Sequence, residues 1–245
     1  MDKELIPIGE AAKKLNVSID TLRRWDAAGN LKSVRATSGG NRYYKSIDID
    51  LFSSDLLAVA IEWVKGQVPK DIDPIFHCAD ASVFKGRLDK LEHSLKSTLG
   101  LENDFSLISS IVGEIGNNSF DHNIGQWLDI KGILFAYDLN KRQIVLADRG
   151  QGILTTLKRV KSDLSSDADA LYVAFTKKIS GRAPESRGNG LKFVKLVVTE
   201  LKKSISMELY FQTGEAALNL GEGDKEIEIF YPDFAFRGCL AFIKY

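Results

Sequence analysis

The hydrophobic positions of the first fifty residues follow a helical period. Ile8, Ala11, Ala12 and Leu15 recur at spacings of three and four, which predicts a short amphipathic helix over residues 8–15. A tight turn is expected at residues 16–17. Because the apolar stripe is narrow, this helix needs a partner to cover it.

A second helix is predicted directly after this turn. Ser18 is a good N-cap residue, and Asp20 lies in the first turn, where the helix dipole favours an anion. Leu22 and Trp25 then point inward on the same face. The two helices at this spacing form a helix-turn-helix.

Two short strands are expected after the second helix. They run from Leu31 to Thr37 and from Asn41 to Lys45, and the turn Ser38-Gly39-Gly40 joins them into a hairpin wing. Residues 21–45 carry six basic side chains against the single acid Asp26. This local excess is an electrostatic footprint for nucleic acid in a chain whose formal net charge is zero.

The segment IGEAAKKLNVSIDTLRRWDAAGNL, followed by GGNRYY, resembles the winged helix-turn-helix of MerR-type regulators and phage excisionases over about residues 5–52. The resemblance implies DNA binding. It places Ser18, Thr21, Arg23 and Arg24 on the major-groove helix, and Arg35, Arg42 and Tyr43 on the wing. The alternative is a degenerate unit that contacts protein. The long dimerisation helix of full-length MerR regulators is not evident in the sequence.

Further along the chain, helical and alternating patterns predict a larger mixed domain. Residues 51–74 combine the apolar run LLAVAIEWV with Gly66, Pro69 and Pro74, which indicates a short helix that buttresses the first domain and then a connector. We therefore expect a DNA-binding domain at 1–52, a connector at 53–74 and a second domain at 75–245. In the second domain, helices on one face of a largely antiparallel sheet make a two-layer α/β sandwich.

The chemistry of this domain is concentrated on the helix predicted at about residues 105–123. Glu114, Asn118, Asp121 and His122 follow one edge of this helix, next to an apolar stripe. Such an edge lies at the rim of a core. The alternative to a functional site is a polar network that caps a core helix.

Two glycine pairs follow this helix. Residues 144–153, IVLADRGQGI, end a β-branched run with Asp-x-Gly-x-Gly, and residues 186–194, SRGNGLKFV, open an apolar helix. In this order after Glu-x-x-x-Asn, they resemble the GHKL superfamily of gyrase B, chaperone, mismatch-repair and kinase ATPases. The resemblance implies the Bergerat ATP-binding fold, with ATP and Mg²⁺ as cofactors.

The expected roles combine this resemblance with the chemistry of each group. Asp148 accepts the adenine amino hydrogen, Gly150 and Gly152 let the backbone pass beneath the base, and Asn118 supplies an oxygen to magnesium. The second glycine pair opens a helix N-terminus that favours phosphate, and the polar stretch before it has the length of a lid. The remaining expected ligand contacts are Asn117, Lys177, Lys178, Arg182, Arg187, Gly188, Asn189 and Gly190.

The role of Glu114 distinguishes a site that hydrolyses ATP from one that only binds it. In the family pattern this residue activates the attacking water, or a protein hydroxyl in the kinase branch, so it is the candidate general base. We expect an ATPase whose nucleotide state modulates DNA or partner binding. A serine protein kinase of the anti-sigma type and a nucleotide-sensing module with negligible turnover stay open.

Two further residues bear on the site. His122 either hydrogen-bonds Glu114 through water or only caps the helix, and we favour the cap. Where many family members have Gly-Thr in a late strand, this chain has Gly238-Cys239. Because a thiol is a weak donor, adenine is expected to be held less tightly there, or through water.

The composition and the first residues bear on the location of the protein and on the chemistry of its cysteines. The first residues lack the pattern of a signal peptide, and no run of 18 uncharged apolar residues occurs, so a cytoplasmic protein without membrane association is expected. Cys78 and Cys239 match no metal or redox spacing and are expected to be reduced thiols. DNA is the expected partner, while a protein partner and a homodimer are left open.

Overall fold

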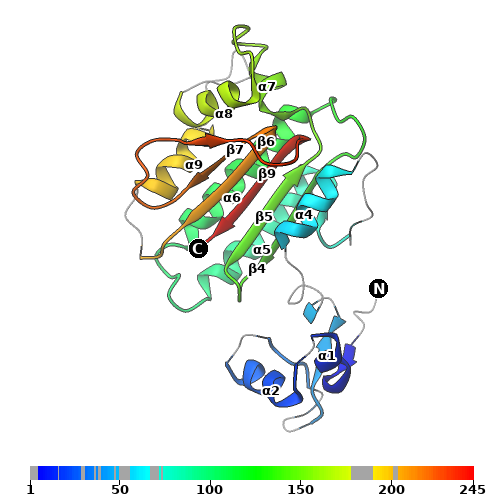
Figure 1. Ribbon diagram of the computed structural model, residues 1–245. Coiled ribbons are helices and arrows are strands. Elements are labelled where there is room, and N and C mark those ends of the chain that lie inside the picture. Colours follow the sequence, from blue (N-terminus) through cyan, green and yellow to red (C-terminus); the bar gives the residue numbers. More distant parts are fainter. Residues whose placement is uncertain are drawn as a thin grey trace.

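The structure is a computed structural model. It describes residues 5–15, 17–28, 31–35, 37, 40–46, 48–49, 56–66, 72, 74–177, 190–200 and 204–245. Within these ranges, no helix has the length and apolar character needed to cross a bilayer. The described residues form a small N-terminal unit and a large mixed α/β domain (Figure 1).

The N-terminal unit contains the two predicted helices, α1 (Ile8–Lys14) and α2 (Ile19–Ala28). The Ser18 hydroxyl accepts a hydrogen bond from the Thr21 backbone N–H at 3.0 Å, so Ser18 caps α2 as expected. Leu22 is fully buried in a small core with Ile6 and Tyr44. The helix-turn-helix expectation is therefore confirmed by the elements and their packing.

The wing is smaller than predicted. Strand β2 (Tyr43–Lys45) pairs with the N-terminal strand β1 (Leu5–Pro7), not with a strand over residues 31–37. A single antiparallel bridge joins Val34 to Tyr43. Ile6 is buried in the small core, which holds β1 on the edge of β2 opposite Val34.

A seven-stranded sheet forms the middle of the large domain among the described residues. Its order is β3-β4-β5-β9-β6-β7-β8, and every neighbouring pair is antiparallel. The strands are β3 (His77–Cys78), β4 (Ile133–Asp138), β5 (Gln143–Asp148), β6 (Glu208–Gly214), β7 (Ala216–Leu220), β8 (Ile229–Phe230) and β9 (Phe236–Lys244). β9, at the end of the described chain, lies between β5 and β6, so the C-terminal residues complete the centre of the sheet.

Most helices cover one face of this sheet (Figure 1). They are α5 (Ala81–Lys96), α6 (Phe105–Asn123), α7 (Gly152–Leu157), α8 (Asp167–Thr176) and α9 (Gly190–Thr199). The Asp80 carboxylate caps α5 by accepting from the Ser82 and Val83 backbone N–H groups, both at 2.9 Å. The largest core, with Ile111 and Phe135 among its members, lies between these helices and the sheet. The fold class is mixed α/β with helices on an antiparallel sheet, as expected.

Helix α4 (Leu56–Lys65) corrects one expectation. In the described part of the chain it packs on the other face of the sheet, against β4, β5 and β9, and not on the N-terminal unit (Figure 1). Trp63 is fully buried there with Val145 and Leu240 in a separate core. The helix therefore forms a partial third layer of the large domain.

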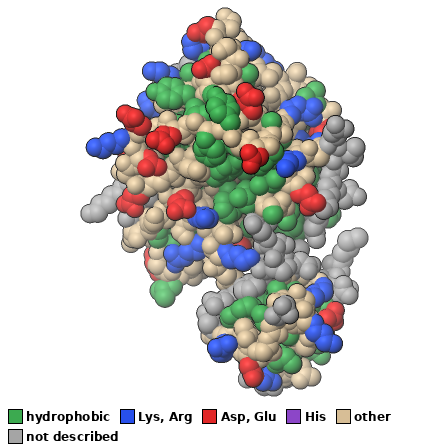
Figure 2. All heavy atoms as spheres, viewed as in Figure 1, with side chains coloured by type: hydrophobic (Ala, Val, Ile, Leu, Met, Phe, Trp, Pro, Cys, Tyr) green, Lys and Arg blue, Asp and Glu red, His purple; other side chains and the backbone are tan. Residues whose placement is uncertain are grey.

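The same view in spheres shows how side chains are distributed on one face (Figure 2). Hydrophobic side chains gather over the middle of the large domain, beside α4. On the N-terminal unit, basic side chains lie at several separate points of the visible surface. The basic excess of residues 21–45 is therefore not gathered into one patch on this face.

Candidate functional site

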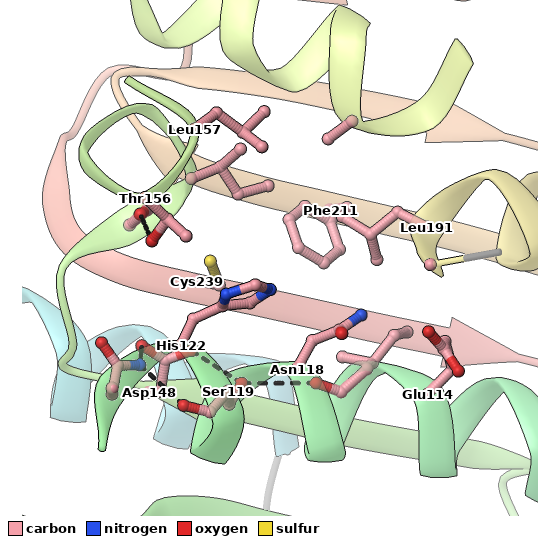
Figure 3. Close-up of a pocket in the computed structure, with 16 residues that line it drawn as sticks. Glu114, Asn118, Ser119, His122, Asp148, Thr156, Leu157, Leu191, Phe211 and Cys239 are labelled. Atoms are coloured by element: carbon pink, nitrogen blue, oxygen red, sulfur yellow. Dashed lines mark hydrogen bonds between the residues drawn. The ribbon is translucent and has the colours of Figure 1, made fainter. Parts of the chain in front are cut away.

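A pocket lies between α6 and the elements that approach it from β5, β6, β9, α7 and α9 (Figure 3). Its volume is about 830 Å³ when the solvent-filled mouth is included. The lining includes five residues that the sequence predicted: Glu114, Asn118, Asp148, Gly152 and Gly190.

One edge of α6 supplies the polar wall. Glu114, Asn118, Ser119 and His122 follow one another along this edge and face the same space (Figure 3). Their spacing of four, one and three residues keeps them within one helical stripe. The neighbouring stripe, which includes Ile111, is buried in the core, so it fixes the rotation of the helix about its axis.

Asp148 forms the buried end of the site. It is the last residue of β5 and is only 1% exposed. Its Oδ2 accepts from the Ser119 hydroxyl at 2.8 Å, and its Oδ1 accepts from the Gly150 N–H at 2.8 Å. Burial raises the pKa of Asp148 to about 6, and the hydrogen bonds from Ser119 and Gly150 only partly offset this rise. Because the Ser119 hydroxyl can rotate, a ligand donor can share Oδ2 with it.

The two glycines after Asp148 serve different purposes. A Cβ at Gly150 would lie 2.2 Å from the amide of Asn123, so this glycine makes room for a protein side chain and not for a base. Gly152 has φ +77°, a left-handed conformation in which a side chain is strained. It starts α7 and, unlike Gly150, lines the pocket.

Apolar side chains close the opposite side. Leu157, Leu191 and Phe211 face the polar edge of α6 across the pocket (Figure 3). Cys239 also lines the pocket, and its sulfur lies 3.8 Å from the hydroxyl oxygen of Thr213 on the neighbouring strand. Burial and the nearby charge of Asp148 hold the pKa of the Cys239 thiol well above its usual value. The thiol therefore stays protonated and can donate only a weak hydrogen bond.

His122 is a wall residue as well as a residue of the last turn of α6. Its backbone carbonyl accepts from the Gln151 side-chain amide at 3.0 Å, and Arg159 donates to the same Gln151 side chain at 2.5 Å. Burial, together with the charge of Arg159, lowers the pKa of His122. The imidazole is therefore neutral at pH 7 and presents a polar, uncharged surface to the pocket.

Two expected contacts, Asn117 and Lys177, and one residue of the expected polar edge, Asp121, lie outside the pocket lining. Asn117 is exposed and is absent from the lining, because it is one residue off the polar edge of α6. Asp121, expected on the same edge, does not line the pocket either. Lys177 is exposed at the C-terminal end of α8 and does not reach it. Five expected phosphate contacts lie outside the described residues: Lys178, Arg182, Arg187, Gly188 and Asn189.

Ser119 and Asn123 are site residues that sequence reasoning did not assign. Asn123 is 4% exposed, donates to the Ser119 carbonyl at 2.8 Å and accepts from the Gln151 N–H at 2.9 Å. It therefore fixes the loop after Asp148 to the end of α6. The signal was available, since Ser119 and Asn123 are four residues apart next to the recognised edge.

The pocket offers few side chains to a metal, so a magnesium ion there would be held largely by a bound phosphate ligand and by water. No group of three or more His, Cys, Asp or Glu side chains in the described part of the chain is placed to hold a metal by itself. The Asn118 amide nevertheless supplies an oxygen atom on the α6 wall. Magnesium commonly takes one or two protein oxygens and completes its shell with waters and phosphates.

In the N-terminal unit, the predicted DNA contacts divide into two groups. Arg23 and Arg24 project from α2, where they donate to the side chains of Asp20 at 2.8 Å and Thr21 at 3.3 Å, one turn away. Such local pairs on an exposed helix are weak and can be exchanged for phosphate.

Arg35 and Arg42 are held more firmly. Both donate to Asp26 Oδ2, at 2.6 and 2.7 Å. Burial alone would raise the pKa of Asp26, but the hydrogen bonds from these arginines hold it well below its usual value. The two wing arginines thus have a structural role in addition to any contact with DNA. Tyr43, the third wing residue, is partly exposed beside them.

Comparison with known proteins identifies the first unit most clearly. Residues 7–44 match the family model of the MerR family regulatory proteins. No curated protein matches the chain at a significant level.

Two solved structures show weak similarity. The ATP-binding domain of topoisomerase IV from Francisella tularensis, in complex with a small-molecule inhibitor, is 18% identical, with 56% of this chain and 62% of that chain covered and a TM-score of 0.33. The N-terminal domain of a DNA repair protein is 13% identical, with 64% and 40% covered and a TM-score of 0.29. This chain spans less than two thirds of either structure, and both TM-scores are too low to establish a shared fold.

Proposed function

We infer that the large domain binds ATP with magnesium, and that the chain is a DNA-binding regulatory protein whose nucleotide state modulates DNA or partner binding. One observation carries the inference. The buried carboxylate of Asp148 lies at one end of the pocket whose α6 wall bears Asn118 and Glu114 towards the other end (Figure 3). Gly190 of the second glycine pair also lines the pocket, so three segments far apart in the sequence meet around one hollow, in the order that resembles the GHKL superfamily.

The two ends of the pocket suit the two ends of ATP. A buried acceptor such as Asp148 favours a base that presents an amino group, and it repels the carbonyl oxygen that guanine has at the same position. At the other end, Asn118 would hold magnesium together with the phosphates, and bound magnesium would neutralise part of their charge. Glu114 is placed to orient a water molecule and accept its proton.

The DNA-binding part of the proposal rests on the N-terminal unit. It has the two helices of a helix-turn-helix, a family match over residues 7–44, and exposed arginines on α2. Arginines of this kind suit phosphates and guanine edges. Arg35 and Arg42 would support the wing through Asp26.

Calorimetric titration tests the nucleotide site. Non-hydrolysable ATP with magnesium is titrated into the wild-type chain and into Asp148→Asn. The substitution keeps the shape of the side chain but turns one acceptor into a donor that faces the adenine amino group. We expect about tenfold weaker binding, because an unpaired buried group costs about 1–3 kcal/mol and a tenfold change corresponds to about 1.4 kcal/mol.

Two comparisons complete the test. The matching GTP analogue should bind the wild-type chain at least about tenfold more weakly, for the same reason. Asp121→Asn, an identical change on α6 outside the pocket lining, should leave ATP binding unchanged. Absence of heat with wild type, or equal heats for wild type and Asp148→Asn, would count against the proposed site.

A further inference from the structure

Asp148 and Arg149 are consecutive residues on opposite sides of the sheet. Side chains at successive strand positions alternate between faces. Asp148 faces the pocket beside α6, whereas Arg149 extends to the face covered by α4 and is 4% exposed. One short backbone segment thus supplies both the wall of the pocket and a buried cation behind it.

Arg149 binds the C-terminal end of α4. Its Nη1 donates to the carbonyl oxygens of Trp63 at 2.7 Å and Val64 at 3.1 Å, and its Nη2 donates to that of Gly66 at 2.8 Å. The last four carbonyl groups of a helix have no partner within the helix, and the dipole favours a cation there. Arg149 therefore caps α4 from a distance of more than eighty residues in sequence.

Asp129 completes the environment of the guanidinium. Its Oδ2 accepts from Arg149 Nε at 2.9 Å and from Nη2 at 2.7 Å. Arg237 approaches the same oxygen at 3.2 Å, but its side chain is 46% exposed. Arg237 thus shares the carboxylate of Asp129, and no bond between it and α4 occurs among the hydrogen bonds and ion pairs of the described residues.

The hydrogen bonds of Arg149 prevent the backbone at Asp148 and helix α4 from moving independently. A buried guanidinium is tolerated when its donors stay paired, so a shift of the backbone at Asp148 must carry α4 with it or break several buried bonds. Conversely, α4 in its observed place restricts the backbone at Asp148. Trp63 lies at this junction, fully buried, and its indole N–H has no hydrogen-bond partner among the described residues.

We propose that Arg149 is a positioning residue that couples α4 to the nucleotide pocket: ATP binding alters the environment of α4, and the contact with α4 sets the affinity for ATP. The coupling presupposes the ATP binding proposed above. α4 is the first described element after the N-terminal unit, so it is also the part of the large domain nearest in sequence to the DNA-binding residues.

Fluorine NMR measures the coupling in the full chain. The chain has three tryptophans, so 5-fluorotryptophan labelling gives a small set of resonances, and Trp63→Phe assigns the signal of Trp63. We expect that signal to shift during titration with non-hydrolysable ATP and magnesium, with the midpoint that calorimetry gives. Amide hydrogen exchange of the peptide covering residues 56–66 should slow severalfold in the same complex. Both measurements use the wild-type sequence apart from the assignment variant.

Two variants distinguish a positioning role of Arg149 from a purely structural one. Arg149→Lys keeps the charge but cannot reach all four acceptors, and we expect about tenfold weaker binding of the analogue, within the usual range of coupling between sites. The shift of the Trp63 signal at saturation should also shrink. Arg237→Met removes the other cation on Asp129 without touching α4, and affinity should stay within about twofold of wild type.

The outcomes are distinct. If the wild-type chain binds the analogue while the Trp63 signal and the exchange of residues 56–66 stay unchanged, the coupling is wrong and ATP binding stands. Equal affinities for wild type and a folded Arg149→Lys would also overturn the coupling. If calorimetry detects no binding to wild type, the proposed function fails and the coupling fails with it.

Discussion

Single residues of the site have properties that were not apparent from their sequence motif. Asp148 was expected to accept the adenine amino hydrogen, and the structure shows that it is buried and already bonded to Ser119 and Gly150. Its carboxylate therefore pays a desolvation penalty in the folded chain. The consequence appears as a pH dependence of stability.

The contribution of Asp148 to the free energy of unfolding should fall as pH rises from about 4 to about 6. The pKa of Asp148 is about 6 in the folded chain, and an ordinary aspartate in the unfolded chain has a pKa of about 4. Between these values the folded chain binds more protons, so deprotonation favours unfolding. The two-unit difference corresponds to roughly 2–3 kcal/mol.

Urea denaturation of wild type and Asp148→Asn at pH 4 and pH 7 isolates this contribution. On going from pH 4 to pH 7, wild type should lose roughly 2–3 kcal/mol relative to the variant, whose amide does not titrate. Parallel stability curves for the two proteins would show that Asp148 has an ordinary pKa.

A second prediction for a single residue concerns Glu114. Glu114→Gln keeps the size and polarity of the side chain but removes the base, so phosphate release should slow by about 10²–10⁴-fold while analogue binding stays the same. The measurement is single-turnover release of labelled γ-phosphate, with Asp121→Asn as the matched change on α6. An unchanged rate of release would remove Glu114 from the reaction, and transfer of the label to a protein serine would indicate a kinase.

At the scale of elements, the packing of α6 against α5 is set by a glycine. A Cβ at Gly116 would lie 2.1 Å from the ring of Phe84. That ring cannot move aside, because it is fully buried and packs against Phe120 and Phe135 at centroid distances of 5.9 and 5.3 Å. The close contact holds the polar edge of α6 at its present distance from β5.

Gly116→Ala should therefore destabilise the large domain by about 1–3 kcal/mol, the usual effect of overpacking a core. Gly86→Ala is the matched control, since it also lies inside a helix but a Cβ there would meet no atom within 4 Å. It should stabilise the domain by about 0.5–1 kcal/mol through helix propensity. Urea denaturation reports both, and equal effects of the two changes would contradict the packing argument.

The elements show which features the sequence could predict. The helix over residues 105–123 was predicted correctly because its apolar stripe persists over its whole length, and β5 ends at Asp148 as expected. Helix α4 was placed wrongly because LLAVAIEWV is apolar on most sides. Two of its partners, Val145 and Arg149, lie more than eighty residues beyond Trp63, and no local pattern indicates which core such a helix will join.

The same limit applies within the site. Gly150 was expected to make room for adenine, but it makes room for Asn123, a contact that depends on how the end of α6 meets the loop after β5. Sequence spacing identifies side chains that share a face of one helix. It does not determine which of two neighbouring elements will fill a space between them.

At the scale of the whole molecule, the two units should communicate. If ATP prefers one arrangement of the chain, then saturating ATP analogue with magnesium should change DNA affinity, by roughly 5–150-fold for couplings of ordinary size. Fluorescence anisotropy with a labelled duplex measures this at one fixed salt concentration, because salt alone changes such affinities strongly. Asp148→Asn should raise the analogue concentration at which the effect appears, by the factor by which it weakens analogue binding. Identical DNA affinity with and without analogue in wild type would refute communication between the units.

The position of α4 also determines where the chain can be divided. A fragment beginning at residue 75 would lack α4, leaving the apolar side chains of Leu134, Val145 and Leu240 bare and most donors of Arg149 without acceptors. Such a piece is expected to aggregate when expressed alone, whereas one beginning just before Leu56 keeps this surface covered. A chimeric protein that combines this large domain with another DNA-binding unit would therefore need its junction before Leu56, so that α4 stays with the sheet.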